Sequence, residues 1–342
     1  MRIITKEEAI FGSGELKCEY MRQHRLNHRT NSEVKKRVMR FLTPGTGISI
    51  TIVVGPTGAG KTTLGWGILD EVYRKYSTEI TADPNIIPGA YVEVPAAMHG
   101  HVDWSEFHRR AGTAVKAPLM DYRIAEFDPE STDGADVFNR SASLRHAFEQ
   151  SARLRKLRHL ILDECGHFLA SNDEPKEYGD FLKSMASCGG MNILMLGAYG
   201  AEKIIEASSQ LARRVNLVHF PRYKRSQAKL YGQFLESYSR ILPLAAYLDL
   251  VPYQEILFQG CCGLVGLTCD TLMASVLEAS EMGGEWKENY LWNAMPSEAK
   301  RRTILEDIWR GEEVIERYIS SENRPNYRAE EDDYADFIKR KN

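Results

Sequence analysis

Short apolar runs recur between residues 48 and 220, and polar or glycine-containing turns bound each of them. Runs of this length that are apolar at nearly every position are typical of buried parallel strands. Five runs qualify: 48–54, 90–94, 159–163, 192–197 and 215–220. Helical patterns lie between them, so the chain is expected to be an α/β protein with a five-stranded parallel sheet and right-handed crossovers.

Apolar residues at helical spacing also flank the first of these runs. Asn31 or Ser32 is expected to cap a helix that ends at Pro44–Gly45, immediately before the first strand. A second helix is expected directly after the first strand, and the pattern breaks at Ser77. Further helical patterns continue beyond residue 222 without another strand.

These patterns divide the chain into four parts. We expect an N-terminal helical segment over 1–46, a core that contains the five strands over 47–222, a small helical lid domain over 223–285 and a C-terminal helix with a tail over 286–342. The end of the tail is polar, acidic and interspersed with aromatic residues, a composition typical of a segment that orders on a partner. The tail is therefore predicted to dock a partner.

Composition narrows the class of protein. The 342 residues are 43% hydrophobic and 27% charged, which is ordinary for a soluble globular chain. No apolar stretch approaches the roughly 20 residues of a membrane helix, so we expect a cytoplasmic protein with no membrane partner. The net charge of −3 does not decide whether the chain binds nucleic acid. The six cysteines show no C-x-x-C pair, so buried reduced thiols are expected rather than a zinc site or disulfides.

The segment after the first apolar run reads Gly-Pro-Thr-Gly-Ala-Gly-Lys-Thr over residues 55–62. A strand before and a helix after such a segment are the context of a phosphate-binding loop. Lys61 is expected to reach the β- and γ-phosphates of ATP, and the Thr62 hydroxyl to bind Mg²⁺. The residues expected to contact the nucleotide are Gly55, Pro56, Thr57, Gly58, Ala59, Gly60, Lys61, Thr62 and Thr63.

The strand at 159–163 ends in two acids, Asp163 and Glu164. Such a pair is weak evidence alone, because strands commonly end in charged turns, but it gains weight after an upstream phosphate-binding loop. Asp163 is expected to hold Mg²⁺ as the Walker-B acid, and Glu164 to polarise the water that attacks the γ-phosphate. The sequence therefore predicts an ATPase with ATP and Mg²⁺ as its cofactors.

Two further segments concern hydrolysis. ATPases of this kind often place a polar side chain that senses the γ-phosphate after the fourth strand, where this chain has Ala198 and Tyr199, so that role is doubtful. Arg213 and Arg214 precede the fifth strand, where a guanidinium can cross to a neighbouring subunit's γ-phosphate as an arginine finger. The alternative is that both arginines merely complement a helix dipole.

Taken together, these motifs resemble those of the AAA+ ATPases that regulate DNA transposition. The similarity covers roughly residues 20–280 and is closest to the TniB and TnsC group, with MuB and IstB more distant. Besides the two nucleotide motifs, it depends on 191–197, on Gln210-Leu-Ala-Arg-Arg214 followed by Phe220-Pro221, and on the glycine-spaced helix start at Gly263–Gly266.

The resemblance implies a protein that assembles on double-stranded DNA as a homo-oligomeric ring or helical filament, with six or seven subunits in a ring or turn. It would mark a target site with a target-selector protein and recruit the transposase, and ATP hydrolysis would disassemble it. The tail at the end of 286–342 would dock the transposase or a targeting protein. Arg213 or Arg214 would then act in trans. Ala198 and the absence of an arginine from 260–268, where many AAA+ proteins carry a second sensor, imply slow turnover.

The same resemblance places residues 103–116 at a central pore. Arg109, Arg110 and Lys116 are therefore the candidate DNA-phosphate contacts. The alternative is an exposed amphipathic helix with Trp104 and Phe107 on its core face.

Two other functions remain open. A helicase loader or replication initiator of the same fold would bind single strands or a helicase. A small-molecule phosphotransferase would share the loop but needs a mobile lid that carries arginine, and the Asp163–Glu164 pair argues against it.

Overall fold

The structure of the protein is a computed structural model that describes residues 3–24, 26, 28–42, 49–97, 101–118, 134–169, 175–187, 190–207 and 209–319. The chain divides into two compact units. One comprises residues 34–54 and 61–219 and is called the sheet unit here, and the other comprises 1–33, 55–60 and 220–342 and is called the helical unit. The four-part division expected from the sequence stays a prediction.

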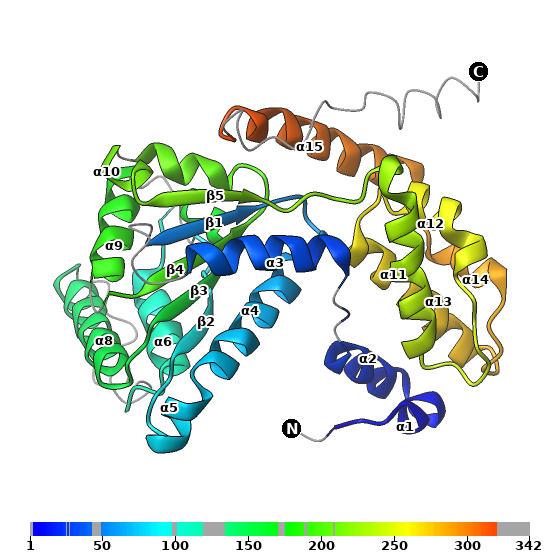
Figure 1. Ribbon diagram of the computed structural model, residues 1–342, viewed down its shortest axis with the longest axis horizontal. Helices are drawn as coiled ribbons and strands as arrows, with labels where there is room; N and C mark the ends of the chain where they lie inside the picture. Colours follow the sequence, from blue (N-terminus) through cyan, green and yellow to red (C-terminus); the bar gives the residue numbers. More distant parts are fainter. Residues whose placement is uncertain are drawn as a thin grey trace. The chain divides into compact units, whose positions relative to one another are not determined.

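The sheet unit is built on five parallel strands in the order β2-β3-β4-β1-β5 (Figure 1). Their bounds are β1 Ile50–Val54, β2 Gly89–Glu93, β3 His159–Asp163, β4 Asn192–Gly197 and β5 Val215–His219. Every residue of β1, β3 and β4 is buried, which explains why their sequences are nearly continuous apolar runs. The predicted α/β fold with a five-stranded parallel sheet is confirmed.

Helices connect and cover these strands: α4 Lys61–Lys75, α5 Ser77–Ala82, α6 Trp104–Ala114, α8 Gly134–Leu154, α9 Pro175–Ser187 and α10 Ser209–Ala212, with 3₁₀ turns at Cys165–Phe168 and Ala201–Ala207. Helix α4 packs along β2, β3 and β4. A Cβ on Gly65 would lie 2.6 Å from Leu196 Cδ1 and 2.9 Å from Tyr91 Cε2. This glycine therefore lets α4 approach the sheet closely, and α4 carries the end of the phosphate-binding motif.

The helix before β1 starts earlier than the sequence suggests. It is α3, Arg29–Phe41, whereas Asn31 or Ser32 was the expected cap. The Ser32 backbone N–H already donates to the His28 carbonyl at 3.0 Å, so the helical pattern is established upstream. Asn31 is buried rather than positioned as an exposed cap. The expected stop at Pro44–Gly45 lies outside the described residues.

The helical unit contains α1 Lys6–Phe11, α2 Gly14–Gln23, α11 Ala228–Ile241, α12 Gln254–Gly260, α13 Val265–Glu281, α14 Glu288–Ala294 and α15 Glu298–Glu316, with 3₁₀ turns at Arg225–Gln227 and Val251–Tyr253. Its core gathers aromatic and aliphatic side chains from α11, α12, α13 and α14. Cys261 and Cys262 are buried, and burial raises the pKa of the Cys269 thiol to about 12. These cysteines are core residues, as expected from the sequence.

Among the helices that the structure describes, no single one is long and apolar enough to cross a bilayer. A bent pair, residues 251–260 with Val265–Glu281, reaches the required length and composition only when its two segments are combined across a bend of 115°.

Two buried histidines of the sheet unit make a testable prediction about acid stability. Burial lowers the pKa of His108 and of His159 to about 4 from the ordinary 6.5. Below pH 6.5 these histidines bind protons in the unfolded chain but stay neutral in the folded chain. The free energy of unfolding therefore falls as the pH drops towards 4, by up to about 3 kcal/mol per histidine. Urea unfolding between pH 7.5 and 4.5 should show this loss.

His108→Phe should flatten the acid loss, because its aromatic surroundings accept a phenyl ring. His146→Phe is the matched control, since His146 is exposed, and it should leave the pH dependence unchanged. Equal pH dependence in the wild type and in His108→Phe would contradict the assignment for His108.

Candidate functional site

The glycine-rich segment Gly55–Gly60 joins β1 to α4 along the chain. Gly58 and Gly60 have φ angles of +79° and +103°, in the left-handed region that favours glycine. The Ala59 backbone N–H donates to the Pro56 carbonyl at 3.2 Å, and α4 begins at the next motif residue, Lys61. Such a turn leads into the backbone N–H groups of a first helical turn and the positive end of the helix dipole, which is the arrangement that binds phosphate.

Within the helical unit this segment makes two close backbone contacts. The Gly266 N–H donates to the Gly58 carbonyl at 2.7 Å, and a Cβ on Gly266 would lie 2.6 Å from that oxygen. A Cβ on Gly55 would lie 2.1 Å from the Phe220 carbonyl oxygen. The sequence marked Gly263–Gly266 as a helix start, but only the structure shows that glycine is required at 266 to hold the loop.

Thr62 and Asp163 come together in the sheet unit. The Thr62 hydroxyl donates to Asp163 Oδ2 at 2.8 Å, although the residues are 101 positions apart. Asp163 is the last residue of β3 and is only 5% exposed. A hydroxyl and a carboxylate side by side at the carboxyl ends of parallel strands fit the oxygen ligands that Mg²⁺ uses beside a nucleotide. Both residues that the sequence assigned to Mg²⁺ are therefore neighbours.

Tyr91 on β2 is a neighbour of this pair that sequence reasoning missed. Its hydroxyl also donates to Asp163 Oδ2, while Asp163 Oδ1 accepts from the Glu164 backbone N–H at 2.9 Å. The Tyr91 ring stacks on Trp66 of α4 with ring centroids 4.3 Å apart. Three donors thus orient the Asp163 carboxylate. No sequence signal separates Tyr91 from an ordinary strand tyrosine.

Glu164 has an unusual backbone. Its φ is +54°, in the left-handed region that non-glycine residues seldom adopt, and its side chain is exposed. A carboxylate held directly after the buried Asp163 and open to solvent suits a group that acts on water. Three residues further on, His167 Nδ1 lies 2.9 Å from the Val94 carbonyl, so this histidine has a structural role.

A polar pair lies at the carboxyl ends of β4 and β5, at the position where the sequence made γ-phosphate sensing doubtful. The Tyr199 hydroxyl and His219 Nε2 are 2.9 Å apart, and which of them donates depends on the histidine tautomer. His219 is in register with Val54, the last residue of β1 before the glycine segment. A hydrogen-bonding side chain is therefore present near this edge, in the form of a tyrosine.

Arg213 and Arg214 lie at the opposite edge of the sheet. Both are exposed, and the Arg214 carbonyl accepts from the backbone N–H groups of Ser49 and Ile50, at the start of β1. The strand from Ile50 to Val54 spans about 13 Å. These arginines are therefore not gathered with Thr62 and Asp163 within one protomer.

Arg109 and Arg110 lie on α6 and share one acid. Arg109 Nε is 2.6 Å from Glu106 Oε2, and Arg110 Nε is 2.7 Å from Glu106 Oε1. The hydrogen bond from Arg109 is the main cause of a lowered pKa of Glu106. Lys116 is exposed beyond the helix end, with φ at +54°. Sequence reasoning missed the role of Glu106, which neutralises part of the expected basic surface.

Comparisons with known proteins agree with this architecture. A family model described as an AAA domain matches residues 46–205. No curated protein matches the sequence. Among solved structures, similar chains include the ORC1 protein of Aeropyrum pernix in complex with DNA, with a TM-score of 0.53 and 16% identity over 93% of this chain and 74% of that one.

Two further structures are similar. The Walker-type ATPase PABY2304 of Pyrococcus abyssi has a TM-score of 0.50 and 13% identity over 86% of this chain and 79% of its own. The ORC2 protein of Aeropyrum pernix has a TM-score of 0.48 and 17% identity over 77% of this chain, which spans 66% of that protein, just under two thirds.

The chain therefore matches the AAA domain model over residues 46–205 and has the fold of the P-loop AAA+ ATPases: a five-stranded parallel sheet followed by a helical C-terminal region. Nucleotide binding and nucleotide hydrolysis are the general activities of this class. The similarity to solved structures, at these identities, concerns the fold alone.

Proposed function

We propose that this chain is an ATP-dependent, DNA-binding AAA+ ATPase that regulates DNA transposition. It assembles on double-stranded DNA as a ring or helical filament, marks the target site with a target-selector protein and recruits the transposase. The observation that carries the ATPase part is the hydrogen bond between Thr62 and Asp163, which joins the two nucleotide motifs at the carboxyl edge of the sheet.

In this proposal the residues 55–63 hold the triphosphate of ATP, with Lys61 on its β- and γ-phosphates. Thr62 and Asp163 would hold Mg²⁺, which would supply positive charge beside the phosphates. Tyr91 keeps the Asp163 carboxylate oriented, as its hydrogen bond indicates. Glu164 accepts a proton from the attacking water as general base.

The position of Arg213 and Arg214 supports the oligomer. Both are exposed at the edge of the sheet opposite Asp163, so neither serves the nucleotide of its own protomer. An arginine that completes a neighbour's site makes assembly depend on bound nucleotide, and in our proposal hydrolysis releases the subunits.

The assignment to transposition is supported by the motif set shared with the TniB and TnsC group, including the Gln210–Arg214 stretch and the helix start at Gly263–Gly266. Binding to DNA is supported by the fold likeness to the ORC1 chain, whose structure was determined with DNA.

Electron microscopy of the purified protein tests the proposal. With duplex DNA and a non-hydrolysable ATP analogue we expect rings or filaments, and without nucleotide we expect dispersed protomers. The Lys61→Ala protein is the control and should stay dispersed under both conditions. Equal assembly with and without nucleotide would rule out the proposed mechanism.

A second candidate, a replication initiator or helicase loader, is favoured by the fold likeness to ORC1. Competition between DNA substrates separates the two functions. The transposition regulator should prefer duplex to single strands and should not bind a replicative helicase, whereas the opposite pattern supports the second candidate.

The proposed DNA contacts make a separate prediction. Replacing Arg109, Arg110 and Lys116 together by alanine should weaken duplex binding. It should also reduce the slope of log affinity against log salt by up to about 0.9 for each phosphate that the variant no longer neutralises. Arg109 and Arg110 must break their ion pairs with Glu106 before they can contact DNA phosphate. Glu106→Gln should therefore strengthen duplex binding.

Fluorescence anisotropy over a salt series measures both effects. Arg302→Ala is the matched control, because Arg302 is an exposed arginine paired within its own helix. If the triple variant keeps the wild-type affinity and slope, DNA does not contact this surface.

A further inference from the structure

His28 is a buried histidine of the helical unit, directly before α3. It is 8% exposed, and its ring centroid lies 6.2 Å from that of Phe220, 5.5 Å from that of Tyr223 and 6.0 Å from that of Phe234. Burial lowers the pKa of His28 to about 4, so the imidazole is neutral at neutral pH. This side chain therefore offers hydrogen bonds without a charge.

The glycine segment of the ATP site lies beside this histidine. His28 Nε2 is 4.0 Å from the position that a Cβ on Gly60 would take. A Cβ on Gly58 would lie 3.9 Å from Leu264 Cδ1 and 4.0 Å from Leu267 Cβ. Neutral and apolar side chains suit a heterocyclic base, whereas a phosphate is bound by cations and backbone N–H groups.

The Tyr223 hydroxyl decides which nitrogen of His28 carries the proton. The hydroxyl oxygen is 3.1 Å from His28 Nδ1. Burial raises the pKa of Tyr223, while the Thr30 side chain and the backbone of Thr30 and Arg29 act against this rise as donors to the same oxygen. With donors on its oxygen, the hydroxyl is left to donate to Nδ1. We therefore assign the ring proton of His28 to Nε2.

The Nε2–H group has room for an acceptor from outside the chain. Among the residues that the structure describes, His28 forms a hydrogen bond through Nδ1 but none through Nε2. Both ring nitrogens of His108 and of His159 are enclosed without partners, and His28 Nε2 is not enclosed in this way. A donor next to the phosphate-binding segment is therefore open to a ligand there.

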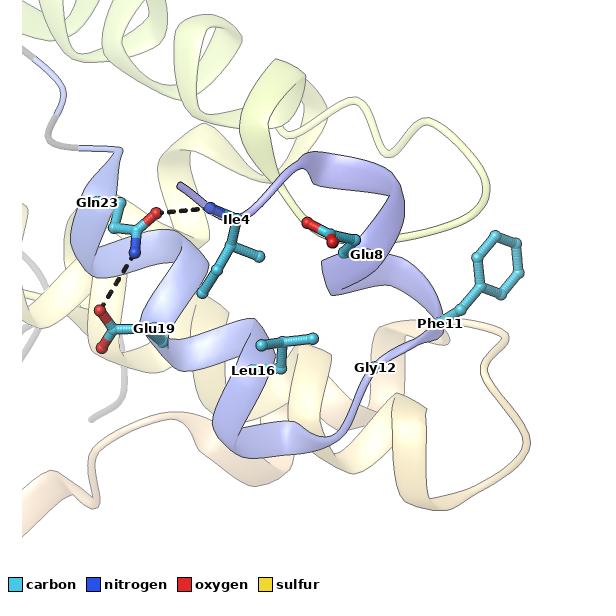
Figure 2. Close-up of a pocket in the computed structure, with 7 residues that line it drawn as sticks. All are labelled: Ile4, Glu8, Phe11, Gly12, Leu16, Glu19 and Gln23. Atoms are coloured by element: carbon cyan, nitrogen blue, oxygen red, sulfur yellow. Dashed lines mark hydrogen bonds between the residues drawn. The ribbon is translucent and has the colours of Figure 1, made fainter. Parts of the chain in front are cut away.

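The segment that carries His28 is held on both sides. On α2, Gln23 accepts from the Ile4 backbone N–H at 3.0 Å and donates to Glu19 at 3.3 Å, as Figure 2 shows for the pocket that these three residues help to line. On the other side, α3 begins at the next residue, Arg29. A change confined to the His28 ring leaves both of these anchors in place.

We propose that His28 recognises the base of bound ATP, with its Nε2–H group donating a hydrogen bond to a ring nitrogen of adenine. The contact rests on the function proposed above, because it takes ATP held by residues 55–63 as given. A ring nitrogen of adenine is an uncharged acceptor, which matches an uncharged donor among aromatic side chains.

Deaza analogues of ATP test the contact. Each analogue replaces one ring nitrogen, N1, N3 or N7, by a CH group and so removes one acceptor. We expect one of the three to bind the wild type about tenfold more weakly than ATP does. His28→Phe keeps an aromatic ring in place and removes the donor, so this variant should bind that analogue and ATP equally. Competition with a fluorescent nucleotide, without DNA, measures each affinity.

His24→Phe is the matched control. His24 is a half-buried histidine at the end of α2, and its Nδ1 lies 2.8 Å from the Tyr20 carbonyl oxygen. This variant should keep the wild-type difference between ATP and the analogue. The contact is overturned if the wild type binds all three analogues as tightly as ATP, or if His28→Phe keeps the wild-type difference.

The Lys61→Ala protein separates this result from a failure of the proposed ATP site. If the wild type binds ATP and Lys61→Ala does not, the ATP site stands, and equal binding of the analogues overturns the contact of His28 alone. If the wild type does not bind ATP, both proposals fail.

Discussion

Replacing the arginine finger by alanine is expected to lower the ATPase kcat of the assembled protein by about 10³- to 10⁵-fold, since a finger meets charge that develops in the transition state. The structure leaves Arg213 and Arg214 as candidates, because both are exposed directly before β5. Measuring each single variant on duplex DNA at saturating ATP identifies the finger. The ATP affinity of the isolated protomer should change little, because neither arginine lies beside Thr62 and Asp163 of the same protomer.

A mixing experiment tests the action in trans. The arginine variant keeps an intact ATP loop but lacks the finger, and the Lys61→Ala variant keeps both arginines but lacks the loop lysine. Each variant is therefore expected to be inactive alone. When they are mixed, a loop from the first subunit meets an arginine from the second, and part of the activity should return. Arg225→Ala is the matched control, because Arg225 is an exposed arginine paired with Glu255, and it should change the ATPase activity little. Mixed assemblies that form but stay inactive would contradict the trans role.

Glu164→Gln is expected to reduce kcat by about 10²- to 10⁴-fold while ATP still binds, because the amide keeps the size of the side chain but cannot accept a proton. ATP binding should persist since the Thr62–Asp163 pair is untouched. Because hydrolysis is proposed to disassemble the polymer, this variant should also stay on DNA far longer than the wild type.

Phosphate release and nucleotide affinity, measured on the same preparation, separate these two effects. Asp163→Asn is the informative comparison: it changes the carboxylate that accepts from Thr62, Tyr91 and the Glu164 backbone. It should weaken Mg-ATP binding as well as hydrolysis. If Glu164→Gln hydrolysed ATP at the wild-type rate, another group would be the base.

Much of the sheet unit was predictable, because the residues that the fold must bury in its strands form apolar runs along the sequence. The five apolar runs became β1 to β5, with ends within two residues of the prediction. Buried parallel strands must be apolar on both faces, so they can be recognised from a single sequence. The glycine loop was equally clear, since only glycine tolerates the φ angles found at Gly58 and Gly60.

Other features could not be read from the chain. Helix α3 starts at Arg29 rather than after Asn31, because Asn31 is buried and does not serve as a cap. The sequence suggested that Arg109 and Arg110 form a basic surface, but in the fold both arginines form ion pairs with Glu106. Side-chain pairing of this kind depends on rotamers and on neighbours that a charge count does not contain.

The amino-acid sequence by itself determined the parallel α/β sheet, the glycine turn and the two acids at the end of β3, because these depend on backbone freedom and on apolar runs. Only the tertiary structure decided that Thr62 and Tyr91 both donate to Asp163, and that Arg213 and Arg214 lie at the far edge of the sheet. The physical reason is register. Parallel pairing sets which strand ends share an edge, and that pairing joins residues about a hundred positions apart.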